Sequence, residues 1–316
     1  MSGRVGFCID VKMSRAQCAP PCEPERDEAS PPPTPEETWL TLRCMNASMS
    51  LFHFSLMCLT FFVGDVSLSV PLWENGVGLN TNGSGTGFLA PSLSRSDLSF
   101  PLTVSTALFF FLSAFFHFGN AALWYDAYTR LLRRKVSPFR WGEYFLSATT
   151  MILLISVVSG VLDVSRLVLI ASLIATTMTF GLVTELVSIP SPCEDEWTSP
   201  LSLRLVPHLL GYIPQITAWV EIMRTFYSSS GEGGGPPAFV YAIVWIELLL
   251  FFSFGFIQLY VLLRPPSHYE RGEYMYQVAS LVSKGTLGVI LLTNVLFLST
   301  YECVVDEFAD LNPDKC

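Results

Sequence analysis

Long apolar segments separated by short polar connections make up most of this chain beyond residue 45. Apolar runs of about 18 or more residues with few charges are typical of transmembrane helices. The pattern therefore predicts an all-α membrane protein, with one seven-helix domain at residues 43–303 embedded in the lipid bilayer. We expect spans near residues 47–70, 102–127, 141–161, 164–189, 203–227, 238–263 and 274–301.

The segments outside the spans have a different composition. Residues 1–42 are rich in Pro, Glu and Ser and cannot bury enough apolar surface to fold alone, so we expect a disordered cytoplasmic tail. Its Cys18 and Cys22 are expected to be unpaired thiols rather than a metal or redox site. The Gly- and Asn-rich connection at 73–101 predicts a turn or short hairpin. We expect residues 304–316 to be a short acidic extracellular tail.

Composition agrees with a membrane protein. Hydrophobic residues make up 51% of the chain, charged residues make up only 14%, and the mean hydropathy is +0.45. These values exclude an ordinary soluble domain. The net charge of −9 comes mostly from the tails and connections, so we expect no nucleic-acid partner.

Lysine and arginine are distributed unevenly between the two membrane faces. One face carries Arg130, Arg133, Arg134, Lys135, Arg140, Arg204, Arg264 and Arg271, and the other carries only Arg95, Arg166, Arg224 and Lys315. Connections rich in these residues stay in the cytoplasm. The amino terminus is therefore predicted to be cytoplasmic and the carboxyl terminus extracellular.

Lys284 lies at the centre of the last apolar segment. It is the only charged residue between Gln277 and Thr300. A lysine at the centre of a transmembrane helix costs roughly 2.5–3.5 kcal/mol on insertion scales. We therefore treat Lys284 as the principal candidate functional residue.

A carboxylate is available to pair with this lysine. Glu143 lies at the start of the third span with Ser147 one turn later, and Ser280 lies one turn before Lys284. A buried amine and a buried carboxylate in one bundle should pair, because each alone is costly. The residues leave two interpretations open, an imine between Lys284 and an aldehyde with Glu143 balancing the charge, or a structural salt bridge.

Four further polar residues within the spans are candidates for a proton path. His53 and His117 can face each other across the bundle and form a proton-accepting pocket. Glu221 and Glu247 lie deep in the fifth and sixth spans, where acids tend to line proton or cation paths. The alternatives are hydrogen-bonded core histidines and neutral glutamic acids hydrogen-bonded across helices.

Three stretches of the chain resemble the heliorhodopsins. They are RWGEYFLSATTM in the third span, FVYAIVWIELLLFF in the sixth, and YERGEYMYQVASLVSKGTL leading into the seventh. The resemblance extends over roughly 42–300. It implies a rhodopsin-like seven-helix photoreceptor rather than an enzyme, with the inverted orientation that the basic residues also predict.

The resemblance also implies a chromophore and its contacts. Lys284 would carry all-trans retinal as a protonated Schiff base, Glu143 would be the counterion, and Ser280 and Ser147 would hydrogen-bond around that pair. His53 and His117 match the paired histidines near which the released proton resides in this family. The resemblance further implies a homodimer.

Aromatic residues are candidates for the wall around the polyene. They are Tyr144, Tyr212, Trp219, Trp245 and Phe252. The fifth span departs from the family, because Pro214 is followed by Gln215 where heliorhodopsins have Pro-Trp. This replacement removes an aromatic side from the expected pocket.

Our interpretation is a retinal-binding photoreceptor with an unknown signalling partner. The alternative is a light-activated proton channel or transporter that uses Glu221 and Glu247. A third reading is a retinal-free membrane protein in which Lys284 and Glu143 form a structural pair.

Overall fold

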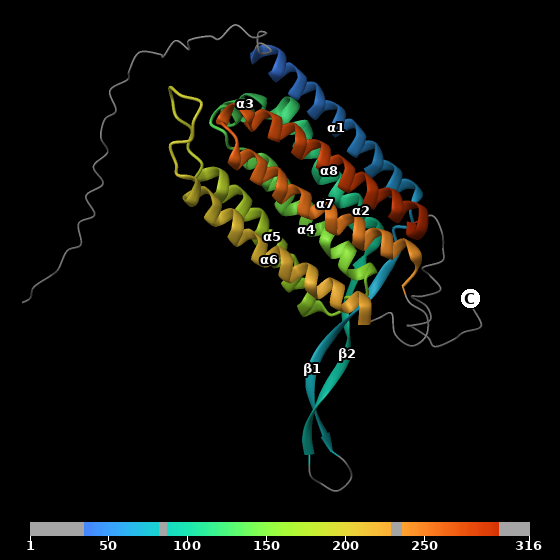
Figure 1. The fold of residues 1–316 in the computed structure, drawn as a ribbon. Coiled ribbons are helices and arrows are strands. Elements are labelled where there is room, and N and C mark those ends of the chain that lie inside the picture. Colours follow the sequence, from blue (N-terminus) through green and yellow to red (C-terminus); the bar gives the residue numbers. More distant parts are fainter. Residues whose placement is uncertain (1–34, 82–86, 229–235, 297–316) are drawn as a thin grey trace, which may run out of the picture.

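A computed structural model describes residues 35–81, 87–228 and 236–296 (Figure 1). Its seven long helices are α1 Pro35–Val63, α2 Leu102–Phe118, α4 Pro138–Val158, α5 Val164–Leu186, α6 Leu201–Ser228, α7 Ala238–Leu263 and α8 Tyr269–Leu291. These helices form a closed ring in the order α1, α2, α4, α5, α6, α7 and α8, with α8 returning to α1. Side chains such as Ile155, Ile170 and Val244 fill the interior without exposure.

Among the described residues, six helices are long and apolar enough to cross a membrane. The seventh long helix, α6, carries Arg204, His208, Gln215 and Glu221, which make it more polar. It nevertheless lies between α5 and α7 in the ring. The predicted seven-helix membrane bundle is thus confirmed, and α6 completes its ring.

Two predicted boundaries differ from the structure at the cytoplasmic end. α1 begins at Pro35, so residues 35–42 belong to the first helix and not to the tail. The second span ends earlier than residue 127, because a π-helical turn at Gly119–Leu123 separates α2 from a short helix, α3 Tyr125–Arg133. Gly119 permits this turn, since a Cβ atom there would lie 1.8 Å from the Trp124 ring.

The last long helix, α8, has a short helical turn of a different type at each end. α8 is preceded by a 3-10 turn at Pro266–His268 and followed by a second π-helical turn at Leu292–Leu296. The predictions for Cys18, Cys22 and the acidic tail at 304–316 lie outside the described residues.

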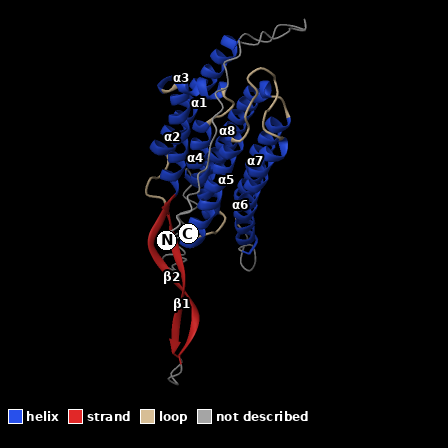
Figure 2. Cartoon of the chain, turned by 90° about the vertical axis from the view of Figure 1, so that its left-hand side faces the viewer, coloured by secondary structure: helices blue, strands red, loops and turns tan. Residues whose placement is uncertain are grey.

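A two-stranded antiparallel hairpin projects from the extracellular end of the bundle (Figures 1 and 2). Its strands, β1 Ser69–Thr81 and β2 Gly87–Pro101, are longer than the predicted short hairpin and are the exception to an all-α fold. The base is fixed to the α4–α5 connection, where Trp73 N donates to Leu162 O at 2.9 Å and Asn75 Nδ2 donates to Asp163 Oδ2 at 2.7 Å.

Candidate functional site

Lys284 and Glu143 form a buried ion pair between α8 and α4. Lys284 Nζ donates hydrogen bonds to Glu143 Oε1 at 2.8 Å and to Ser280 Oγ at 2.6 Å. Both charged side chains are only 3% exposed. The predicted pairing of the amine with a carboxylate and with the hydroxyl one helical turn before it is therefore present.

Two histidines extend the polar cluster from Glu143 toward α1. His117 Nε2 lies 4.0 Å from Glu143 Oε2, and the His117 ring stacks on His53 with a centroid distance of 5.8 Å. Asn46 Nδ2 donates to Leu42 O at 2.9 Å, so its Oδ1 faces His117 Nδ1 at 2.8 Å. His117 Nδ1 must therefore carry a proton, and Nε2 of the neutral ring has a free lone pair facing the ion pair.

A cavity of about 330 Å³ adjoins the Lys284 amine, and we call it the proximal cavity. Its walls come from α4, α5, α7 and α8 and comprise Tyr144, Ser147, Ala148, Met151, Met178, Phe251, Phe254, Ser280, Ser283 and Lys284. The Ser147 hydroxyl is buried here without a hydrogen-bond partner in the described structure. The Lys284 ammonium also lies 5.1 Å from the centre of the Tyr144 ring.

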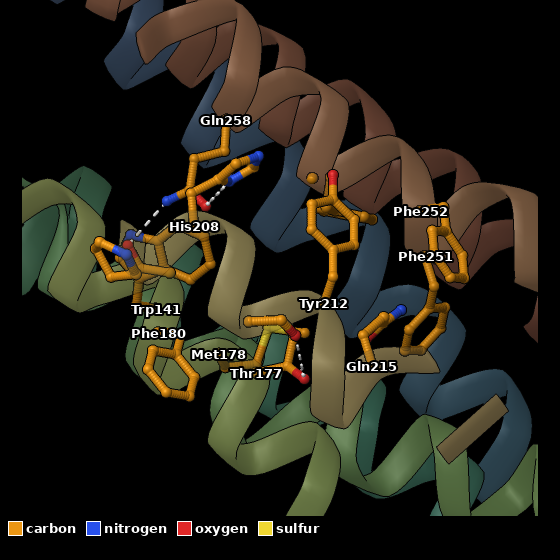
Figure 3. A pocket seen from close by; sticks show the side chains of 15 residues that line it. Trp141, Thr177, Met178, Phe180, His208, Tyr212, Gln215, Phe251, Phe252 and Gln258 are labelled. Atoms are coloured by element: carbon orange, nitrogen blue, oxygen red, sulfur yellow. Dashed lines mark hydrogen bonds between the residues drawn. The ribbon is translucent and has the colours of Figure 1, made fainter. Parts of the chain in front are cut away.

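A second cavity lies beside the first, between α5, α6 and α7 (Figure 3). Met178, Phe251 and Phe254 line both cavities, so the two share a wall. We call this second space the distal cavity; its other lining residues include His208, Tyr212, Gln215, Phe252 and Gln258. The proximal cavity adjoins the Lys284 amine, and the distal cavity adjoins α6.

The structure separates the predicted aromatic residues into three groups. Tyr144 lines the proximal cavity, while Tyr212 and Phe252 line the distal cavity and stack on each other with ring centroids 6.2 Å apart. Trp219 is buried against Phe251 but lines neither cavity. Trp245 is 45% exposed and lines neither cavity, which contradicts its predicted place in the pocket wall.

The two predicted deep glutamates lie in different environments. Glu247 is fully buried and accepts a hydrogen bond at 2.7 Å from Ser283, the residue before Lys284. Glu221 is not deep: it is partly exposed and accepts two hydrogen bonds from Arg224, with Arg166 Nε at 3.5 Å. The prediction was wrong for Glu221, because an arginine one turn away on the same helix neutralises it near the helix end.

A second buried ion cluster lies on the cytoplasmic side of the pair. Arg140, one turn before Glu143 on α4, forms ion pairs with Glu185 of α5 and Glu273 of α8. Tyr128 of α3 donates to Glu273 at 3.0 Å, and the Arg140 guanidinium lies 4.2 Å from the centre of the Tyr276 ring. This cluster ties four helices together at the cytoplasmic end of the bundle.

Sequence reasoning missed several residues that the fold brings to the site. The sequence signal was available for His208 and Gln258, since both are polar residues inside apolar segments. It was absent for Met151, Met178 and Phe254, because apolar residues on a membrane helix can face lipid, core or ligand equally well.

Comparison with protein families identifies the family of this chain. The model of the heliorhodopsin family matches residues 42–296. No curated protein matches the chain at a significant level. The matched region contains both ion clusters and all of the ring helices except the first seven residues of α1.

Proposed function

The chain belongs to the heliorhodopsin family, and we propose that it senses light through retinal bound to Lys284 as a protonated imine, with Glu143 as the counterion. Membership in this family makes the chain a retinal-binding, light-sensing, multi-pass integral membrane protein with its amino terminus in the cytoplasm. The observation that carries the proposal is the buried Lys284–Glu143 pair beside a cavity lined mainly by apolar side chains.

The lining of the site is compatible with retinal. The proximal and distal cavities are lined mainly by apolar and aromatic side chains, with a few polar groups, as is typical of small-ligand sites. Their shared wall of Met178, Phe251 and Phe254 provides apolar contacts for a polyene. The unpartnered Ser147 hydroxyl in the proximal cavity gives a further polar contact close to the amine.

The residues around the amine would hold the charge of the bound state. Retinal supplies the light-driven isomerisation, and the protein supplies the linkage and the electrostatics. Glu143 stabilises a positive charge at the Lys284 nitrogen, and Ser280 accepts a hydrogen bond from the same nitrogen. In an apolar site, these two groups replace the water that would otherwise solvate the charge.

We assign the role of proton acceptor to His117, with His53 behind it. The free lone pair on His117 Nε2 faces Glu143, so a proton leaving the Lys284 nitrogen has an acceptor nearby. Both ring nitrogens of His53 are buried without a partner among the described residues, so His53 can exchange a proton with a neighbour.

Light-activated proton transport is the second candidate function, and one observation favours it. Glu247 is buried beside the residue that precedes Lys284, where an acid can exchange protons with the site. Glu221 has no such position, so a transport path would include Glu247 but not Glu221. The photoreceptor proposal, in contrast, includes a homodimer and a signalling partner whose identity is unknown.

Reconstitution with retinal tests the proposal. Adding all-trans retinal to the purified chain should produce a visible absorption band, and Lys284→Ala should remove it while leaving the protein monodisperse. Absence of a band in the unmodified protein would contradict retinal binding. Light-evoked currents in voltage-clamped cells that fall in Glu247→Gln, but not in Glu221→Gln, would favour transport over signalling.

A further inference from the structure

The distal cavity has polar groups that an all-hydrocarbon ring cannot satisfy. His208 and Gln215 of α6 are each only 4% exposed, and both line this cavity (Figure 3). In the described structure, His208 Nε2 and Gln215 Oε1 have no hydrogen-bond partner. Buried polar atoms of this kind are paired in most proteins, so a bound molecule is expected to supply a partner.

The hydrogen-bond network around His208 determines which kind of partner it needs. Gln258 Nε2 donates to Gly181 O at 2.9 Å, which turns Gln258 Oε1 toward His208 Nδ1 at 3.1 Å. A carbonyl oxygen only accepts, so Nδ1 carries the proton and Nε2 of the neutral ring is an acceptor. Both unpartnered atoms, His208 Nε2 and Gln215 Oε1, therefore require a donor.

The position of the cavity determines which part of the ligand meets these atoms. Under the proposed function, on which this inference rests, the aldehyde end of the ligand is fixed at Lys284. The polyene then passes Met178, Phe251 and Phe254, and its ring enters the distal cavity beside α6. The group that meets His208 and Gln215 is thus a substituent of the ring.

We propose that the distal cavity recognises a hydroxyl group on the chromophore ring, so that the preferred ligand is a ring-hydroxylated retinal. A hydroxyl has one proton, and it donates this proton to His208 Nε2. A ring ketone does not meet this requirement, because it has no proton to donate. A plain hydrocarbon ring leaves both acceptors without a partner.

A competition for Lys284 tests this preference. The full chain, prepared without retinal, is offered equimolar all-trans retinal, its 3-hydroxy and 4-hydroxy derivatives, and the 4-oxo derivative. Borohydride reduction then traps whichever aldehyde has bound, and mass spectrometry of the Lys284 peptide gives the ratio. We expect a hydroxy derivative to exceed both retinal and the ketone by about 10-fold, the effect of one net hydrogen bond.

Three variants identify the source of the preference. His208→Phe should reduce it to near 1-fold, and Gln215→Leu should reduce it less. Thr177→Val is the matched control in the same cavity and should leave the ratio unchanged, because the Thr177 hydroxyl already donates to Leu173 O at 3.1 Å. A preference that survives in folded His208→Phe would overturn the assignment.

The unmodified chain gives a decisive result even where a variant does not fold. Equal trapping of retinal and its hydroxy derivatives would overturn the inference and indicate that water satisfies the two acceptors. Equal trapping on Lys284 would still support the proposed function. No trapping of any aldehyde on Lys284 would instead contradict the proposed function itself.

Discussion

Two buried cations, Arg140 of α4 and Lys284 of α8, each pair with carboxylates inside the bundle and differ in what surrounds them. Arg140 is enclosed by two carboxylates and by the rings of Trp141, Tyr269 and Tyr276, and it lines neither the proximal nor the distal cavity. Lys284 has one carboxylate, one hydroxyl and an open cavity beside its amine. Burial of charge is common to both, so burial alone does not identify a ligand site.

The two clusters differ in whether the cation has space beside it for a bound molecule. The fork-shaped guanidinium of Arg140 matches two carboxylates, and this geometry suits a fixed structural link between helices. The Lys284 amine is a compact group next to free volume, and an amine can form a bond to carbon whereas a guanidinium in an ion pair does not. We therefore interpret Arg140 as structural and Lys284 as functional.

The largest expected effect separates Glu143 from the other buried glutamates. In the retinal-bound protein, Glu143→Gln removes the carboxylate that balances the imine charge, so the visible band should convert to an ultraviolet band at neutral pH. Glu273→Gln, a matched change in the Arg140 cluster, should keep a visible band. Absorption spectra of the two variants measure the position of the band. An unchanged visible band in Glu143→Gln would contradict the role of Glu143 as the counterion.

The next effect concerns stability at Arg140. Arg140→Gln leaves Glu185 and Glu273 buried without their cation, which should destabilise the protein by about 3–5 kcal/mol. Thermal unfolding in detergent, followed by circular dichroism, measures the loss. A variant with wild-type stability would show that this cluster does not hold the helices together.

A smaller effect of opposite sign is expected at the lysine. The double variant Lys284→Met, Glu143→Leu replaces a costly buried ion pair by apolar side chains. Without retinal, its free energy of unfolding should equal that of the unmodified chain or exceed it by about 1–4 kcal/mol. The same thermal measurement applies, with Lys284→Met alone as the control that leaves an unpaired carboxylate. A strongly destabilised double variant would indicate that the pair is structural, like that of Arg140.

The smallest effect is expected at Glu247. This acid has no cation in hydrogen-bonding contact in the described structure and bonds only to Ser283, so we expect it to be neutral. Gln has the same shape and keeps that bond, and Glu247→Gln should change stability by less than about 1 kcal/mol and retain the visible band. Conversion to an ultraviolet band would instead make Glu247 a second counterion.

The sequence predicted those features that depend on charge and length. Seven helices, the Lys284–Glu143 pair and the neighbouring Ser280 follow from the cost of burying charge and from the helical repeat, and all are present. Glu221 was misplaced, because its neutralisation by Arg224 and Arg166 depends on the height of each residue in the bilayer. Trp245 was misplaced, because sequence does not show which face of a helix that is apolar on nearly every side meets the interior.

Chemical identification of the modified lysine tests the central claim most directly. The chain has four lysines, Lys12, Lys135, Lys284 and Lys315, so a trapped retinyl group can be assigned without ambiguity. Reduction of the retinal-bound protein with borohydride, followed by peptide mass spectrometry, should place the group on Lys284 alone. A retinyl group on another lysine, or on none, would contradict the assignment of Lys284 as the chromophore attachment site.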